Sequence, residues 1–269
     1  MITSRASILL GAAVGLAALA GQPTSGNAAD LGSIKDGYAP PPPGRVWYLK
    51  GTIGMHNHEV GDLDYAPFHT NDFTIYHEDM KSAPFFGLGI GVEHSRWLRF
   101  DVTGEYRGKF LFLAQDSYPG GSGFTAGTNE YTADIESWLG LVNAYIDIGT
   151  WRGITPYVGG GIGIDSLSVQ GLKDVNVPQN GVAYGADNTE TNFAWALYAG
   201  MSFDVTPQFV VDLGYRYVDL GDAKSGTVTT YNGSSSGPGL EINDVTSHDL
   251  MLNVRWRLEH PATSFEAVK

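Results

Sequence analysis

Residues 248–258, which read His-Asp-Leu-Met-Leu-Asn-Val-Arg-Trp-Arg-Leu, decide the fold class of this chain. Every second residue from Leu250 to Leu258 is apolar, whereas the alternate positions, beginning at Asp249, include Asn253 and two arginines. Successive side chains of a β-strand point to opposite faces, so this segment predicts a strand with one apolar and one charged face. A soluble antiparallel strand shows the same pattern. The rest of the sequence is therefore needed to tell whether the apolar face of this strand contacts a protein core or lipid.

Seven further stretches alternate in the same way. They span residues 46–56, 84–94, 98–107, 132–148, 154–167, 192–205 and 209–219. The connections alternate in length: those at 95–96, 149–153 and 206–208 are short, and those at about 57–83, 108–131, 168–191 and 220–245 are long. An even number of strands joined alternately by short turns and long loops is typical of bacterial outer-membrane barrels, whose long loops are extracellular. The pattern predicts an all-β, eight-stranded antiparallel up-and-down transmembrane β-barrel.

The beginning of the chain has the features of an export signal. Arg5 precedes an apolar run at 8–20, and the small residues Ala28 and Ala29 offer a cleavage site. The run is shorter than the roughly 20 residues of a spanning helix, so we expect cleavage and no transmembrane helix in the mature chain. The expected organisation is a signal peptide at 1–29, a Pro-rich extended arm at 30–45, the barrel at 46–258 and a short tail at 259–269.

Composition narrows the range of functions. The chain of 269 residues has no cysteine, which excludes disulfides and thiolate metal sites. Its net charge of −13 makes nucleic acid a poor candidate partner. The content of 36 glycines and 12% aromatic residues suits a barrel better than a helical protein.

The polar parity of the predicted strands carries fourteen charged residues. They are Lys50, Glu93, Arg99, Asp101, Glu105, Arg107, Asp147, Asp165, Asp204, Asp212, Arg216, Asp249, Arg255 and Arg257. An eight-stranded barrel is just wide enough for side chains to fill it, and an unpaired buried charge is costly. We therefore expect a structural network of salt bridges in the interior; a gated ion or proton path is the alternative.

The apolar parity is expected to face lipid. Four tryptophans lie on it near strand ends: Trp47, Trp138, Trp195 and Trp256. Tryptophan is enriched at both interfaces between membrane and water. These residues are predicted to form the aromatic girdle of the barrel.

Four segments carry a resemblance to a known group. They are Ala28-Ala29-Asp30-Leu31, Pro156-Tyr157-Val158-Gly159-Gly160-Gly161, Gly214-Tyr215-Arg216-Tyr217 and Leu252-Asn253-Val254-Arg255-Trp256. Over residues 46–258 the sequence resembles the small eight-stranded outer-membrane barrels of the OmpA-transmembrane and opacity-protein type, particularly the Omp-like porin family of alphaproteobacteria. One departure is that the last strand closes at Leu258 rather than at an aromatic residue, and a tail follows.

The resemblance implies a place in the bacterial outer membrane. The partners it implies are outer-membrane lipid and lipopolysaccharide, the barrel-assembly machinery and a host or surface ligand held by the loops. Some members interact with small solutes or haem. The resemblance brings no catalytic residues and no cofactor.

Histidines are concentrated around the first long loop. His56, His58, His69 and His77 lie in or beside it, with several acidic residues. Imidazole and carboxylate groups suit a divalent metal or haem iron, although this spacing matches no defined site. These four residues are the candidates for ligand contact, and a solvated loop surface is the alternative.

The expected role is structural and surface-interacting, in envelope integrity, adhesion or host contact, without catalysis. A narrow or ligand-gated pore is the first alternative, together with a surface protein that binds haem or metal. A lipid-modifying enzyme ranks third: Ser247 and His248 lie at the predicted long-loop rim, but no accompanying acid can be placed from the sequence.

Overall fold

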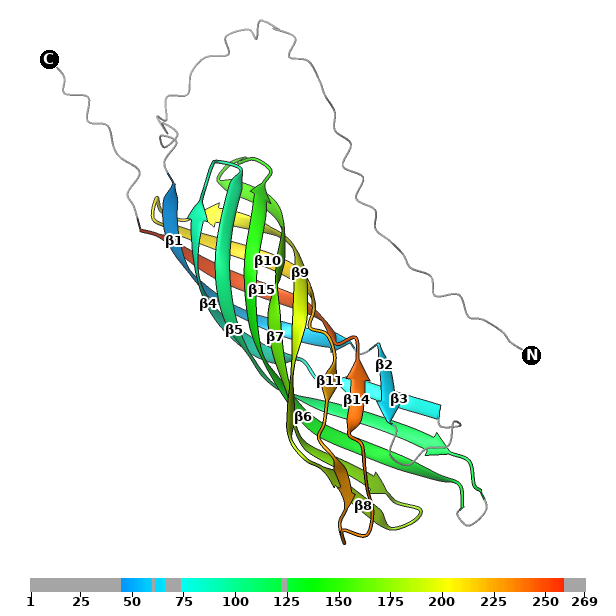
Figure 1. The fold of residues 1–269 in the computed structure, drawn as a ribbon. Coiled ribbons are helices and arrows are strands. Elements are labelled where there is room, and N and C mark those ends of the chain that lie inside the picture. Colours follow the sequence, from blue (N-terminus) through cyan, green and yellow to red (C-terminus); the bar gives the residue numbers. More distant parts are fainter. Residues whose placement is uncertain (1–44, 60, 66–73, 122–124, 259–269) are drawn as a thin grey trace, which may run out of the picture. The chain divides into compact units, whose positions relative to one another are not determined.

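The computed structural model describes residues 45–59, 61–65, 74–121 and 125–258, and structural statements below concern these ranges (Figure 1). The expected signal peptide at 1–29, the arm up to residue 44 and the tail at 259–269 lie outside them, as does His69. Within the described ranges, no helix has the length and apolar character needed to cross a membrane.

Eight antiparallel strands form a closed ring. In ring order they are β1 (Val46–Glu59), β4 (Ala83–Glu93), β5 (Leu98–Tyr118), β6 (Gly127–Asp147), β7 (Ile154–Asn176), β9 (Asn188–Asp204), β10 (Phe209–Asp219) and β15 (Thr246–Arg257). Strand β15 pairs with β1 from Tyr48↔Arg257 to Glu59↔Thr246 and closes the ring. Each ring strand pairs with the ring strands that precede and follow it along the chain, so the predicted eight-stranded up-and-down barrel is confirmed.

All four segments expected as long loops contain additional β-structure, so the expectation of simple long loops is corrected. The shorter strands are β2 (Asp62–Tyr65), β3 (Thr74–Met80), β8 (Gly181–Gly185), β11 (Ala223–Lys224), β12 (Val228–Thr230), β13 (Ser236–Gly237) and β14 (Leu240–Asn243). Strands β5, β6 and β7 continue well past their predicted ends, and β11, β14 and β2 form a separate small sheet. Figure 1 shows this β-structure at the end of the ring opposite the short turns, which we call the distal end.

Two β-bulges explain why the strands run further than the alternation of the sequence. Arg107 pairs with Ser137, but the next pair is Phe110 with Ile135, so β5 holds one extra residue. Strand β7 holds another, at Gly171, where φ is 61°. Each bulge moves the following side chains to the other parity. The pattern in the sequence therefore breaks at a point where the strand continues.

The ring is apolar on its outer face and charged on its inner face, which is the reverse of a soluble protein. Outward apolar side chains are exposed, such as Leu88 at 77% and Ile162 at 61%, whereas Arg107 and Arg216 inside the ring are fully buried. Beyond the bulges the buried side chains are mostly apolar, although Asp116, Asn129 and Asp174 are also buried there. Phe110, Phe112, Ile135, Leu240 and Ile242 belong to one buried cluster that joins the distal strands to the ring. The interior thus has a charged zone followed by a distal apolar zone.

Candidate functional site in the barrel interior and at the distal end

Asp249 is the centre of the charged zone nearest the distal end. Its carboxylate accepts hydrogen bonds from Arg107 Nη1 and Nη2, both at 2.9 Å, from Arg216 Nε at 2.8 Å and from Ser247 Oγ at 2.6 Å. Arg216 also donates to both oxygens of Glu105, at 2.8 and 2.7 Å. Hydrogen bonds between two charged groups are the strong ones, and paired guanidinium donors fix the geometry. This cluster joins β5, β10 and β15 across the interior.

Asp101 organises the middle of the charged zone. It accepts hydrogen bonds from Lys50 Nζ and Tyr48 Oη, both at 3.1 Å, and from Asn143 Nδ2 at 2.7 Å. Tyr198 extends the network by donating to Asn143 Oδ1 at 2.8 Å. Four strands of the ring therefore meet through one fully bonded carboxylate and its neighbours.

Arg255 makes the central contacts at the end of the charged zone nearest the short turns. It donates two hydrogen bonds to Asp212, at 2.9 and 3.0 Å, and one to Glu93 at 2.8 Å. Arg257 bonds Glu93 and, at 2.9 Å, the more exposed Asp204. Bidentate guanidinium pairs of this kind leave few free donors on the buried side chain. The interior is cross-linked at this level as well.

Most of the fourteen charged residues predicted for the inner parity are buried and paired. Ten are buried, and Glu93, Asp147, Asp204 and Arg257 are partly exposed towards the short-turn end. Thirteen take part in ion pairs, including Arg99 with Asp147 at 3.1 Å. Of the fourteen, Asp165 alone has no ion-pair partner among the described residues, and neither of its oxygens makes a hydrogen bond of normal geometry.

The histidine candidates are not brought together as a loop surface. His56, at the end of the predicted strand, and His58, just beyond it, both lie on β1 and are only 0% and 5% exposed, so neither belongs to a solvated loop surface. Their rings are 4.4 Å apart, and the His58 ring stacks on Phe110 at 4.0 Å. The backbone of His77 lies in β3, and His69 lies outside the described residues. Among the described residues, no group of three His, Asp or Glu side chains is placed to hold a metal ion.

The four predicted girdle tryptophans lie on the outer face. Trp47, Trp138 and Trp256 are 47%, 63% and 46% exposed, and Trp195 is half-buried against Tyr217, with ring centroids 5.5 Å apart. Two further exposed tryptophans, Trp97 and Trp151, lie in the short turns. Strand alternation could not indicate them, because residues of the short turns belong to neither parity.

The pair Ser247 and His248 is split between the two faces of β15. Ser247 is buried in the interior and bonded to Arg107 and Asp249, so its hydroxyl is not available beside His248 at the lipid face. On the outer face, His248 is hydrogen bonded to Tyr215 and lies 3.8 Å from Glu59. The strand therefore separates the two side chains on which the enzyme alternative depended.

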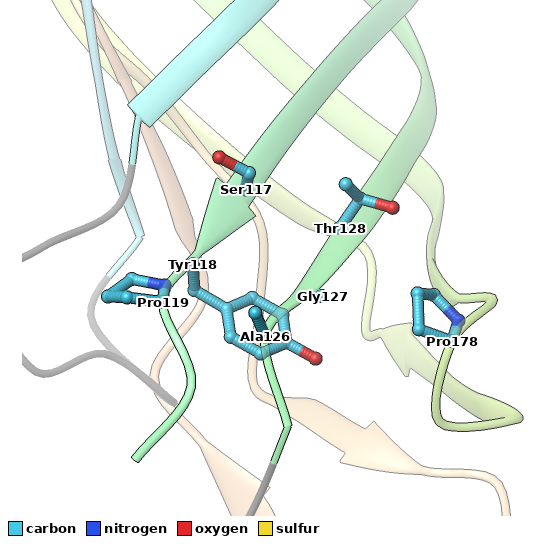
Figure 2. Close-up of a pocket in the computed structure, with 7 residues that line it drawn as sticks. All are labelled: Ser117, Tyr118, Pro119, Ala126, Gly127, Thr128 and Pro178. Atoms are coloured by element: carbon cyan, nitrogen blue, oxygen red, sulfur yellow. The ribbon is translucent and has the colours of Figure 1, made fainter.

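A pocket of about 620 Å³ lies at the tips of the distal hairpins. Its wall comes from the β5–β6 hairpin and from Pro178 in the turn after β7, as Figure 2 shows. Asn176 Nδ2 donates to Tyr118 Oη at 2.6 Å and to Asn129 Oδ1 at 2.9 Å, which fixes the Tyr118 ring at the edge of this pocket. Sequence analysis missed the pocket because it expected a loop here.

A second feature of the distal strands is electrostatic. Lys224 of β11 is hydrogen bonded to Glu241 of β14, and this bond raises the pKa of the Lys224 ammonium. The pair stays exposed, so its contribution to stability is small. The distal β-structure rests on backbone pairing and its apolar cluster more than on such pairs.

A closed antiparallel ring with a charged interior and an apolar, tryptophan-bearing outer face defines an integral β-barrel of the outer membrane. The family described as "Outer membrane protein beta-barrel domain" matches residues 107–257, and this chain belongs to it. Its location is therefore the bacterial outer membrane.

The chain is also similar to individual proteins. An uncharacterised protein of Brucella melitensis is 29% identical over 191 residues, covering 64% of this chain and 67% of the relative. Outer membrane protein PagN of Salmonella typhimurium is 22% identical, covering 78% and 88%. A candidate adhesin of Rickettsia conorii is 26% identical, covering 78% and 81%.

Among solved structures, the outer membrane protein OprG of Pseudomonas aeruginosa matches with a TM-score of 0.48 and 11% identity, covering 78% of this chain and 95% of that one. Neisserial surface protein A matches with a TM-score of 0.41 and 19% identity, covering 80% and 99%.

Proposed function

We propose that this protein acts at the bacterial surface by presenting its distal β-structure to a host or surface ligand. The observation that carries the proposal is the division of the interior. Ion pairs cross-link the charged zone, an apolar cluster fills the distal zone, and the ordered hairpins beyond them offer contact surface instead of a channel. Binding functions commonly lie on connections positioned by a rigid scaffold.

The pocket beside Tyr118 is the proposed contact point. It lies at the tips of hairpins that are continuous with the barrel wall, and aromatic side chains in pockets carry much of the energy of protein recognition. Similarity to proteins named as adhesin candidates in Rickettsia supports a surface role of this kind. Lipopolysaccharide and the barrel-assembly machinery are further proposed partners, since the protein has to be inserted among outer-membrane lipids.

We assign no catalytic role. Ser247 is enclosed in the ion-pair network around Asp249, away from His248 on the outer face. A haem or metal role for His56 and His58 is disfavoured by their burial against Phe110.

Attachment to cultured epithelial cells tests the proposal. A non-adherent bacterial host that displays the wild-type barrel should attach more than the empty-vector host, and Tyr118→Ala should remove most of the gain. Tyr231→Ala is the matched control, because Tyr231 is also a distal tyrosine, 71% exposed, and lies outside the pocket. No gain from the wild-type barrel, or equal losses in the two variants, would reject the contact role of the pocket.

A narrow pore remains the second candidate function, and one observation favours it. Asp165, the neighbouring Ser137 and Arg107 Nε all have buried polar atoms without hydrogen-bond partners among the described residues. Buried polar groups are normally satisfied by protein or water, so water is expected beside them. Planar-bilayer recordings decide: we expect no steady conductance from the wild type, and a stable large conductance would favour the pore.

A further inference from the structure

The outer wall of the barrel contains a groove that shares no residue with the pocket beside Tyr118, and the inference drawn from it rests on the proposal that lipopolysaccharide is a partner. It has a volume of about 550 Å³, and its lining is mostly apolar. Gly51 of β1 and Gly104 of β5 form its floor, on either side of Leu88 of β4, with which both are paired. The adjacent row across the same strands consists of large side chains, including Phe86, Tyr106 and Trp138. Gly104 is paired in turn with Gly140 of β6, so this row lacks large side chains beside Leu88 while the adjacent row is bulky, and the groove is the resulting gap in the apolar surface.

The position of the groove identifies its surroundings. It lies within the apolar band of the barrel, and that band ends at Trp138 on β6, where the next outward residues towards the distal end are Glu136 and Asp134. A tryptophan at such a boundary is typical of the interface between membrane and water. The groove thus opens towards hydrocarbon just below the distal interface, which is the outer leaflet for a barrel with extracellular distal loops.

Polar side chains continue from the upper edge of the groove. Tyr106 Oη and Gln170 Nε2 donate to the two oxygens of Glu136, at 2.9 and 2.8 Å, and Lys109 Nζ donates to Gln170 Oε1 at 2.8 Å. Both Glu136 oxygens are thereby engaged. The exposed Lys109 ammonium has three donors and uses one here, which leaves donors for an anionic group above the groove.

We propose that the groove binds one acyl chain of an outer-leaflet lipopolysaccharide molecule, with a lipid A phosphate at Lys109. The hydrocarbon chain would fill this gap beside Leu88. Because apolar side chains already face lipid, the gain comes from close packing of the chain in the groove rather than from removal of water.

The glycines provide a clean test. A Cβ added at Gly51 or Gly104 meets no atom within 4 Å, so Gly104→Leu should fold normally while filling the groove. Gly160→Leu is the matched control. Gly160 lies on β7, where an added Cβ would meet only Ala196 O at 3.7 Å, and it takes no part in the groove.

The measurement is the amount of lipid A that remains per barrel after purification in mild detergent, from native mass spectrometry and hydroxy fatty acid analysis. We expect Gly104→Leu to lower retention about tenfold relative to the wild type, a change equivalent to about 1.4 kcal/mol. Gly160→Leu should retain as much as the wild type, and Lys109→Ala should lower retention of lipid A but not of zwitterionic phospholipid. Heat-dependent gel mobility checks that every variant is folded.

Three results would overturn the proposal: equal retention in Gly104→Leu and the wild type, equal losses in Gly104→Leu and Gly160→Leu, or retention of phospholipid alone. A detergent-stable dimer that Gly104→Leu converts to monomer would assign the groove to a second copy of this chain instead.

Discussion

Removing the Asp249 carboxylate should be among the most damaging single changes to the barrel. In Asp249→Ala, the cluster loses its central acceptor, and the two arginines retain, among the described residues, the hydrogen bonds of Arg107 to Ser247 Oγ and of Arg216 to Glu105. The side chains of Asp249, Arg107 and Arg216 are fully buried, so water cannot readily replace the lost acceptor. Breaking a buried pair by removing one partner costs about 3–5 kcal/mol because it leaves an uncompensated charge. We expect a loss of that size in the free energy of unfolding.

The assay is urea unfolding of the refolded barrel in lipid vesicles, followed by tryptophan fluorescence. The transition midpoint should fall with little change in its slope, which indicates lost stability rather than a changed extent of unfolding. Asp204→Ala is the matched control: Asp204 is 41% exposed and its partner Arg257 also bonds Glu93, so its loss should cost about 0–1 kcal/mol. Asp249→Ala combined with Arg107→Met should recover part of the loss, because the stranded charge is removed as well. Equal midpoints for Asp249→Ala and Asp204→Ala would refute the reasoning.

Three further predictions concern the lipid-facing side of the strands, the bulge in β7 and the export signal. Leu213→Arg should cost about 2–4 kcal/mol near the membrane midplane, whereas Leu213→Phe should insert like the wild type; equal heat-dependent gel mobility and stability for both would mean that Leu213 does not face lipid. Gly171→Ala should lower stability by about 1 kcal/mol because φ at this bulge is 61°, and Gly51→Ala, with open space at Cβ, should be nearly neutral in the same urea assay. N-terminal sequencing of membrane-derived protein should find cleavage after Ala28 or Ala29, and an intact Met1 would contradict the signal peptide.

Much of the ring was predictable because parity alone determines which face of a strand a residue occupies. The alternation at 248–258 is reproduced by β15, in which Asp249 and Arg255 are buried while Leu250 and Trp256 are exposed. The same rule placed Arg107 and Arg216 inside without any knowledge of their partners. Parity is a local property, so one sequence is enough to read it.

Pairing and strand length could not be read in this way. The partners of Asp249 are 33 and 142 residues away in the chain, and no local pattern encodes such separations. Strands β5 and β7 each continue through a bulge that inverts parity, so the run from Phe110 to Asp116 on β5 looked like the start of a loop. The end of β1 was also not predictable from parity: the strand extends to Glu59, three residues past its predicted end, so His58 lies on the strand with His56 and not in a loop.

On β5 the bulge separates a segment that buries charged side chains from a segment that buries aromatic side chains. Before its bulge, β5 buries Glu105 and Arg107, which the barrel tolerates because partners from β10 and β15 neutralise them. Beyond it, β5 buries Phe110 and Phe112, which need only apolar neighbours. Lipid surrounds the first zone, so its outer face can be apolar while charges pair inside. Water is expected around the second zone, where the ordinary arrangement with an apolar interior is the stable one. The change of interior at the bulge is therefore what allows the wall of a membrane barrel to continue past the membrane as ordered β-structure.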